Sequence, residues 1–329
     1  MRTRTKIILA TLLLLIAGLV AAVAIGFRPS SHPTKTASIG VASDTSKLDA
    51  LIDVPGPITV ESVVGAQWEV DRSGLINLDH PTAKAAGLED GPEAIQVFVH
   101  VLRHPTRGVF LIDSGIEKAL RDDPERAAIR GLVAKVMKTE KMVVEHDTAS
   151  VVNAEGGKIA GVFLTHLHLD HVSGLQDVPK GTPIYAGPGE TATRAFLHAF
   201  VQGSIDRSLE GHDPLAELEF SPDSSGEFAG VLDLFGDGSV FALWVPGHTP
   251  GSVAYLARTT TGPVLFVGDA CHTKWGWENE VEPGSFSHDR PESAVSLKKL
   301  AGLVKKHPAI RVRLGHQSLT HANEPTASR

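Results

Sequence analysis

The alternation of apolar and polar positions along the chain predicts strands and helices in turn. Apolar runs typical of strands lie at residues 95–102, 108–113, 159–165, 182–186, 230–235, 240–245, 252–257, 263–269 and 309–316. Segments with helical spacing lie between them, at residues 125–138, 189–200 and 290–307. The polar, irregular stretch 201–230 predicts a loop or a mobile cap. Strands interspersed with helices predict a layered α/β domain, which we place at residues 59–321 and which is followed by a tail, 322–329.

The first 28 residues predict a targeting or anchoring segment. Basic residues at positions 2, 4 and 6 precede residues 7–27, which carry no charge and are about long enough to cross a bilayer as a helix. The basic flank predicts that the rest of the chain is translocated across the cytoplasmic membrane. Ala22 and Ala24 form an A-x-A-like cleavage site, which favours a signal peptide, whereas the length of the run favours a transmembrane anchor. In both cases the protein works outside the cytoplasm, either anchored or free. Residues 29–58, rich in Ser, Thr, Pro and Gly, predict a linker.

The composition limits the classes of function. The formal net charge of -7, with no stripe of Lys and Arg, argues against binding to nucleic acid. The apolar fraction of 42% is enough for a sizeable core. Cys271 is the only cysteine, so an intrachain disulfide is excluded.

Histidines and acids recur just past the ends of the predicted strands, and such positions gather at one edge of a sheet. They are His166, His168, Asp170, His171, His248, Asp269 and His316. In an extended segment, residues two apart point the same way, so His166 and His168 can bind one metal ion. Asp170 and His171 follow where the chain turns into a helix, so they can serve a second ion. Imidazole and carboxylate ligands without a thiolate suit zinc, manganese, iron or cobalt.

The remaining histidines are interpreted as packed or surface residues, because that is the usual role of an isolated histidine. They are His32, His80, His100, His104, His146, His198, His212, His288, His307 and His321.

The motifs HLHLDH, PGHTPGS, GDA and GH, in that order, resemble those of the metallo-β-lactamase superfamily. The resemblance covers nearly all of the chain from about residue 60 onward and implies an αβ/βα four-layer sandwich with a dinuclear metal site. It implies that the first ion is held by His166, His168 and His248, and the second by Asp170, His171 and His316. It also implies that Asp269 bridges both ions and that Asp113, in LIDSG, supports the ligands from behind.

The C-terminal third is similar to the N-acyl homoserine lactonases in its D-A-x-x-T-K run, its D-x-P-E helix start and its LKKL sequence. The resemblance implies a quorum-quenching type of lactone hydrolase in which a hydroxide bridging two divalent ions, zinc above all, attacks the ring carbonyl. Asp170 would relay a proton. Those lactonases commonly have a tyrosine three residues after the bridging aspartate, and here that residue is His272. We expect His272 to donate a hydrogen bond to the developing oxyanion or to act as a general acid.

True β-lactamases are disfavoured, because Asp269 stands where those enzymes usually have Cys or Ser. Cys271, two residues later, is interpreted as a small buried residue. An acyl-chain pocket is predicted around Trp275, Trp277, Phe286 and residues 137–142, with ordinary packing as the equal alternative. Lys274, Glu278, Glu280 and Glu282 are interpreted as a solvated rim.

Two other functions stay open on the sequence alone. The first is a thioesterase or broad esterase on the same fold, acting on a small-molecule ester. The second is a membrane-tethered protein that keeps the metals without catalysis, although the complete ligand set speaks against it. Whether the chain forms a homodimer is also left open.

Overall fold

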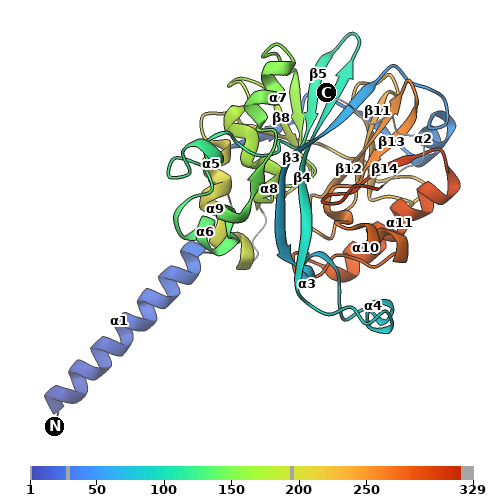
Figure 1. The fold of residues 1–329 in the computed structure, drawn as a ribbon. Helices are drawn as coiled ribbons and strands as arrows, with labels where there is room; N and C mark the ends of the chain where they lie inside the picture. Colours follow the sequence, from blue (N-terminus) through green and yellow to red (C-terminus); the bar gives the residue numbers. More distant parts are fainter. Residues whose placement is uncertain (1, 27–29, 193–195, 320–329) are drawn as a thin grey trace.

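Two β-sheets pack face to face, and helices cover their outer faces (Figure 1). The computed structural model describes residues 2–26, 30–192 and 196–319, so the predicted tail and His321 lie outside the described residues. The side chains of residues 2–5, 21–26 and 196–199 are likewise not described, and His198 is among them.

The first sheet has eight strands in the order β1-β9-β8-β7-β5-β4-β3-β6, and the second has six in the order β14-β13-β12-β11-β10-β2. The strands of the first sheet are β1 (Thr34–Thr36), β3 (Thr59–Asp71), β4 (Pro92–His104), β5 (Gly108–Ile112), β6 (Val143–Val144), β7 (Gly161–Phe163), β8 (Ile184–Ala186) and β9 (Leu215–Glu217). Those of the second are β2 (Val41–Ser43), β10 (Gly230–Asp233), β11 (Val240–Trp244), β12 (Val253–Thr259), β13 (Gly262–Phe266) and β14 (Arg311–Arg313).

The α-helices are α1 (Arg2–Gly26), α2 (Thr45–Leu51), α3 (Arg72–Leu75), α4 (Pro81–Ala85), α5 (Ala119–Asp122), α6 (Gly131–Met137), α7 (Thr148–Ala154), α8 (Leu169–Val172), α9 (Phe196–Leu209), α10 (Lys274–Asn279) and α11 (Arg290–Lys306). Short 3₁₀ turns include η3 (Glu190–Ala192) and η4 (Gly268–Ala270).

Strand residues alternate between two cores, because successive side chains point to opposite faces of a sheet. On β12, Tyr255 and Ala257 pack between the two sheets with Phe163 of β7, whereas Ala254 and Leu256 pack beneath α11. Both faces of β12 are therefore buried, which explains its continuous apolar run.

The helices complete the outer layers. Val151 of α7 and Leu209 of α9 pack on the first sheet, and Leu48 of α2 and Leu300 of α11 pack on the second. Figure 1 shows these helices on opposite sides of the paired sheets. The predicted four-layer αβ/βα sandwich is confirmed.

Residues 34–51 belong to the sandwich, which differs from the linker expected from composition. β1 pairs with β9 at the edge of the first sheet, and β2 pairs with β10 at the edge of the second. Strands of three residues at a sheet edge bury little, so they leave no apolar period to recognise.

Two predicted helices have different bounds in the structure. The helix expected at residues 125–138 begins at Gly131, because the backbone N–H of Ala128 donates to Glu117 instead of to a preceding turn. The loop or cap expected from residue 201 is helical as far as Leu209. Ile205 and Leu209, four residues apart, are buried under the first sheet and hold this extension in place.

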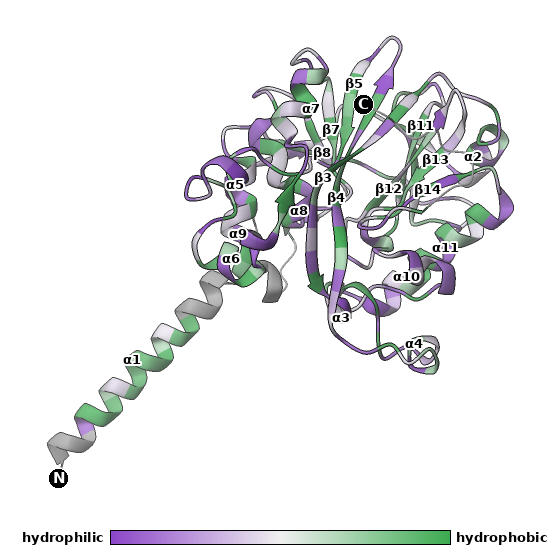
Figure 2. Cartoon of the chain, in the orientation of Figure 1, coloured by the Kyte–Doolittle hydropathy of each residue, from purple (hydrophilic) through white to green (hydrophobic). Residues whose placement is uncertain are grey.

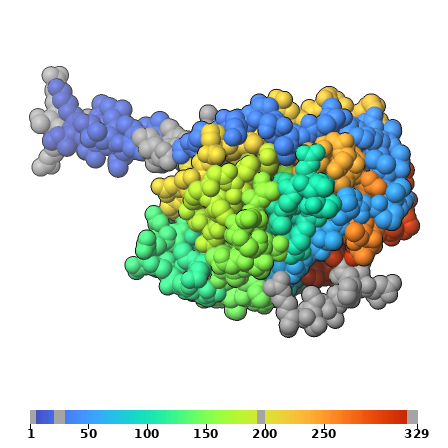
Figure 3. Space-filling model, turned by 90° about the horizontal axis from the view of Figure 1, so that it is seen from above, coloured from blue at the N-terminus to red at the C-terminus, as the bar shows by residue number. Residues whose placement is uncertain are grey.

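Helix α1 stands away from the sandwich, and its described side chains are mostly apolar and exposed (Figures 2 and 3). Within the described residues, no helix combines the length and the apolar character that a membrane crossing requires, so the expected membrane span is not supported.

Candidate metal centre

The predicted ligands come together at one edge of the sandwich, where several strands end. His166 and His168 lie in the turn between β7 and α8, and α8 carries Asp170 and His171. The other three follow strands of the second sheet: His248 after β11, Asp269 in η4 after β13, and His316 after β14. All seven are buried except His168 and Asp170, which are partly buried.

Asp269 lies at the centre of the cluster. Its Oδ2 atom is 3.5 Å from Nε2 of His166, 3.3 Å from that of His171, 3.4 Å from that of His248, 3.1 Å from that of His272 and 3.3 Å from that of His316. Burial raises the pKa of Asp269, but the surrounding imidazoles outweigh it and hold the pKa well below its usual range. The residue is therefore a carboxylate.

The ligand atoms form two neighbouring groups. One comprises His166, His168, His248 and Asp269, and the other Asp170, His171 and His316; a third group joins His272 to Asp269 and His316. Within each group the atoms lie within 4.8 Å of one another. Because Asp269 also lies 3.3 Å from both His171 and His316, it is placed to serve both groups.

Buried polar atoms in the cluster identify it as a site for cations. Nε2 of His166, Nε2 of His171 and Oδ1 of Asp269 are buried and have no hydrogen-bond partner among the described residues. Such atoms are costly to bury unless a ligand satisfies them. Imidazole nitrogen and carboxylate oxygen are ligands of divalent transition metals, so the residues present fit two such ions.

Outer partners orient three of the ligand imidazoles so that Nε2 faces inward. Nδ1 of His171 lies 2.8 Å from Asp113 Oδ2, that of His316 lies 2.9 Å from the carbonyl of Gln96, and that of His248 lies 3.2 Å from Ser287 Oγ. Outer contacts of this kind set the tautomer and the ring orientation of metal ligands. Burial lowers the pKa of His166 and of His248 well below the usual value, so both rings are neutral, as a metal ligand must be.

Asp113 is held in a left-handed backbone conformation (φ 55°), which is uncommon for a residue other than glycine. Its carboxylate accepts hydrogen bonds from the backbone N–H of Thr165 (2.7 Å) and from His171. It thereby connects the end of β5 to the ligand turn. Burial lowers the pKa of His171, but Asp269 and Asp113 reverse the effect and raise it well above its usual value.

Glu190 holds the two ligand turns together, although the sequence analysis did not select it. Oε2 accepts from the N–H of Leu167 (2.9 Å), between His166 and His168, and Oε1 accepts from the N–H of Gly251 (2.9 Å) and the hydroxyl of Thr249. Burial raises the pKa of Glu190 to about 7. The signal was present, because Glu190 follows β8 as the selected acids follow their strands.

Comparison with known proteins places this geometry in a family. Residues 92–316, which end on the ligand His316, match the sequence pattern described as the metallo-beta-lactamase superfamily. The chain belongs to the metallo-β-lactamase superfamily. It is accordingly a metal-dependent hydrolase.

Individual relatives of this metallo-β-lactamase superfamily member confirm the resemblance to lactonases. The N-acyl homoserine lactonase AttM of Agrobacterium fabrum is 27% identical over 235 residues, which are 70% of this chain and 84% of that protein. The gamma-lactamase MBL2 of Gibberella moniliformis is 31% identical over 175 residues, 49% of this chain and 70% of that protein. A crystal structure of a quorum-quenching N-acyl homoserine lactone lactonase shares the fold, with a TM-score of 0.56 and 20% identity over 80% of this chain and 93% of that chain.

His272 stands inside the ligand cluster of this superfamily member. Its ring is 1% exposed, and its Nδ1 atom lies 3.0 Å from the carbonyl oxygen of Leu75 at the end of α3. The Phe286 ring lies edge-on at 6.4 Å from the His272 ring.

The structure separates the residues predicted to line an acyl pocket. Phe286 is partly exposed beside His272, and Trp275, Met137 and Met142 pack against one apolar cluster that includes Leu75. Trp277 packs instead into the core beneath the second sheet.

The sequence analysis also predicted a buried position for Cys271 and an exposed one for Glu282, and the structure agrees only with the first. Cys271 is buried in the same core as Trp277, as expected, and burial raises its pKa to about 12. Glu282 is buried and accepts a hydrogen bond from Asn77, so it does not belong to the predicted solvated rim.

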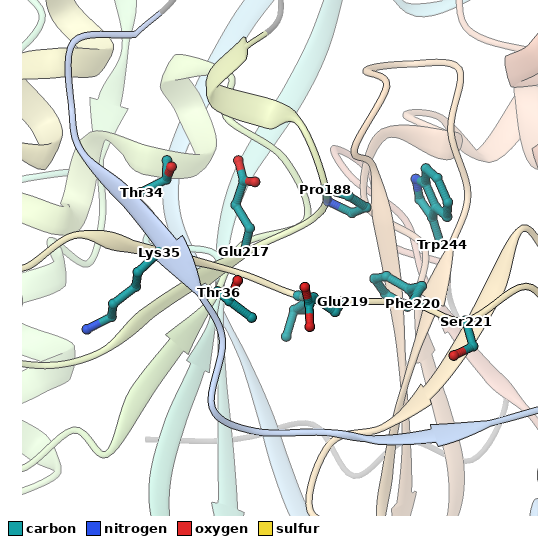
Figure 4. A pocket seen from close by; sticks show the side chains of 10 residues that line it. Thr34, Lys35, Thr36, Pro188, Glu217, Glu219, Phe220, Ser221 and Trp244 are labelled. Atoms are coloured by element: carbon teal, nitrogen blue, oxygen red, sulfur yellow. The ribbon is translucent and has the colours of Figure 1, made fainter.

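A surface hollow of about 750 Å³ lies elsewhere, between the edge strand β1 and β11 (Figure 4). Its lining includes Lys35, Glu217, Phe220 and Trp244 and contains none of the predicted metal ligands. Metal-dependent hydrolysis is therefore assigned to the ligand cluster and not to this hollow.

Several isolated histidines are structural, as interpreted from the sequence. His307 binds Asp49 and Asp53, His104 binds Asp237, and His212 lies 2.7 Å from the carbonyl of Leu175.

Proposed function

We propose that the protein opens lactone rings, those of N-acyl homoserine lactones in particular, with two zinc ions. The observation that carries the proposal is the complete ligand set arranged around Asp269. The similarity to the lactonase AttM over 70% of the chain supports the substrate class.

Two bound divalent ions would supply an acidified water as nucleophile and would polarise the substrate carbonyl. The chain itself must then move a proton from the nucleophile to the leaving oxygen. Asp170 suits this task, because its side chain is 17% exposed whereas that of Asp269 is 4% exposed. Its Oδ2 lies 3.3 Å from Nε2 of His316, so the carboxylate reaches both the ligand cluster and solvent.

The apolar surroundings of the site support a substrate with an acyl chain. Phe286, 38% exposed and next to His272, offers a ring to such a chain. The neighbouring cluster of Leu75, Trp275, Met137 and Met142 supplies apolar side chains beyond it.

The test is a substrate panel on the metal-loaded protein, with acid release followed at constant pH. The panel contains short- and long-chain homoserine lactones, a simple γ-lactone, a thioester, an aryl ester, a β-lactam and a γ-lactam. We expect the highest kcat/KM on homoserine lactones and its loss in His168→Ala. Preference for the thioester or aryl ester would contradict the proposal.

A cyclic amide is the second candidate substrate, because a gamma-lactamase is 31% identical over 175 residues, 49% of this chain. A γ-lactam hydrolysed faster than any lactone would select this candidate. The metal content of the purified protein tests the identity of the ions. Translocation of the domain across the membrane, inferred from the basic N-terminal flank, stays a prediction, as does dimerisation.

A further inference from the structure

We propose that His272 is a ligand of the second metal ion, next to His316 and Asp269. The inference rests on the two-metal site proposed above and does not depend on the lactone substrate.

The position of Nε2 is the first support. This atom is buried, has no hydrogen-bond partner in the part of the chain that the structure describes, and lies 3.1 Å from Asp269 Oδ2. The ligand atoms of Asp269, His272 and His316 lie within 4.8 Å of one another, as those of the two other groups do. His272 therefore meets the same geometric condition as the histidines of the sequence motifs.

The tautomer is the second support. A carbonyl oxygen only accepts hydrogen bonds, so the 3.0 Å contact with Leu75 places a proton on Nδ1 of His272. With that proton on Nδ1, Nε2 is the nitrogen left to bind a metal ion. His316 has the same arrangement, with its Nδ1 against the carbonyl of Gln96 at 2.9 Å. A backbone carbonyl behind a ligand imidazole is a usual partner in metal sites.

This tautomer gives His272 a different role from the one expected from the sequence. A ring that holds a metal ion through Nε2 carries its only proton on Nδ1, directed at Leu75, and has no proton at Nε2 to donate to an oxyanion. His272 instead adds a nitrogen donor beside Asp269 and His316. We therefore expect the second ion to be held more tightly with His272 than without it.

A buried histidine elsewhere in the chain shows what a purely structural role looks like. His212 also approaches a backbone carbonyl, that of Leu175 at 2.7 Å, and its other ring nitrogen is buried with no hydrogen-bond partner within residues 2–26, 30–192 and 196–319. It belongs to none of the potential metal-binding groups among the described residues. Anchoring by a carbonyl is thus common to both residues, and the convergence with Asp269 and His316 distinguishes His272.

The decisive measurement uses the unaltered full-length chain, labelled with nitrogen-15 in its histidines and loaded with an NMR-active cadmium isotope. A bond between cadmium and Nε2 of His272 produces a scalar coupling, as it does at His316. A coupling at His316 without one at His272 would overturn the inference and leave the two-metal site intact. Failure to bind a second ion would overturn both.

Variants give an independent readout. We expect His272→Phe, which keeps a ring in the cavity, to weaken binding of the second ion about 10–100-fold in competition with a chromophoric chelator. His212→Phe is the matched control and should leave this affinity unchanged. In His272→Ala, added imidazole should restore the visible spectrum of the cobalt-loaded protein. Unchanged affinity in His272→Phe together with an unchanged cobalt spectrum would exclude His272 as a ligand.

Discussion

Nδ1 of His171 lies 2.8 Å from Oδ2 of Asp113, and this pair determines which nitrogen of His171 faces the ligand cluster. In Asp113→Asn, an amide N–H₂ must face either His171 or the backbone N–H of Thr165, both of which donate to Asp113. We expect binding of the second ion to weaken about 10–100-fold. Competition with a chromophoric chelator measures the effect.

The control for Asp113 is another Asp–His pair. Asp237 lies 3.0 Å from Nε2 of His104, a residue that belongs to none of the ligand groups. Asp237→Asn should leave both metal affinities unchanged. Equal losses in the two variants would mean that Asp113 acts only through the stability of the fold.

Glu190→Gln tests whether the two ligand turns must be held together. The carboxylate accepts hydrogen bonds from Leu167 on one turn and from Gly251 and Thr249 on the other. The NH₂ group of a glutamine would have to face one of these donors, and that hydrogen bond would be lost. We expect about 1–3 kcal/mol less stability in urea unfolding and weaker binding of the first ion. Glu217→Gln, at the partly exposed end of β9, is the control. A variant that keeps its affinity for the first ion would contradict this role for Glu190.

The ligand cluster could be predicted from sequence because its members obey a local rule. Each follows an apolar run, and strand ends of one sheet edge meet in space. Glu190 follows the same rule after β8, but no dense motif surrounds it, and only the folded chain shows its contacts with the turns at Leu167 and Gly251. The partner of His272 was beyond the reach of sequence analysis, since it is a backbone carbonyl, that of Leu75, 197 positions away.

The edges of the fold were harder to predict than its centre. β12 is buried on both faces and gives an unmistakable apolar run. β3 is half exposed, with a bulge between Val64 and Ala66, so its alternation is interrupted and no strand was predicted there. β1 and β2 are short edge strands whose stability comes from pairing with β9 and β10, a long-range contact that the local pattern does not contain.

The buried carboxyl group of Glu117 should make the free energy of unfolding depend on pH. The residue is 2% exposed, and burial raises the pKa of its carboxyl group to about 7. Because the pKa is higher in the folded than in the unfolded chain, the folded state favours the neutral acid. The stabilisation of the folded state by Glu117 is fully present below about pH 4.3, the pKa of the carboxyl group in the unfolded chain. It is lost as the pH rises through 7.

Removing the carboxyl group should remove this dependence. As the pH rises from 5 to 8, the unfolding free energy of Glu117→Gln should increase relative to that of the unaltered protein by on the order of 2 kcal/mol. Urea unfolding of both proteins at each pH gives the difference, and the effect of metal loss at low pH cancels between them. A difference that does not change with pH would show that Glu117 is ionised in the folded protein throughout this range.

Asp170→Asn tests the proposed proton relay. The amide keeps an oxygen for the metal but cannot accept a proton, so the expected change is a fall in kcat of about 100-fold or more with a far smaller change in KM. Steady-state kinetics on a homoserine lactone gives both values, and the metal content must show that both ions remain bound. An intact kcat in the fully loaded variant would exclude Asp170 from proton transfer.

Gly315 precedes the ligand His316, and the Asp269 carboxylate occupies the space that a side chain at position 315 would need. A Cβ atom at this position would lie 2.1 Å from Asp269 Oδ1 and 2.9 Å from the carbonyl oxygen of Gly268, so Gly315→Ala must displace the central carboxylate or the turn that carries it. Since Asp269 serves both ligand groups, we expect the variant to bind both ions more weakly and to lose most of its hydrolytic activity. Gly302→Ala in α11 is the control, because its Cβ meets no atom within 4 Å and the change should add up to about 1 kcal/mol of stability. If Gly315→Ala bound two ions as tightly as the control does, Asp269 would not be the bridge between the two ligand groups.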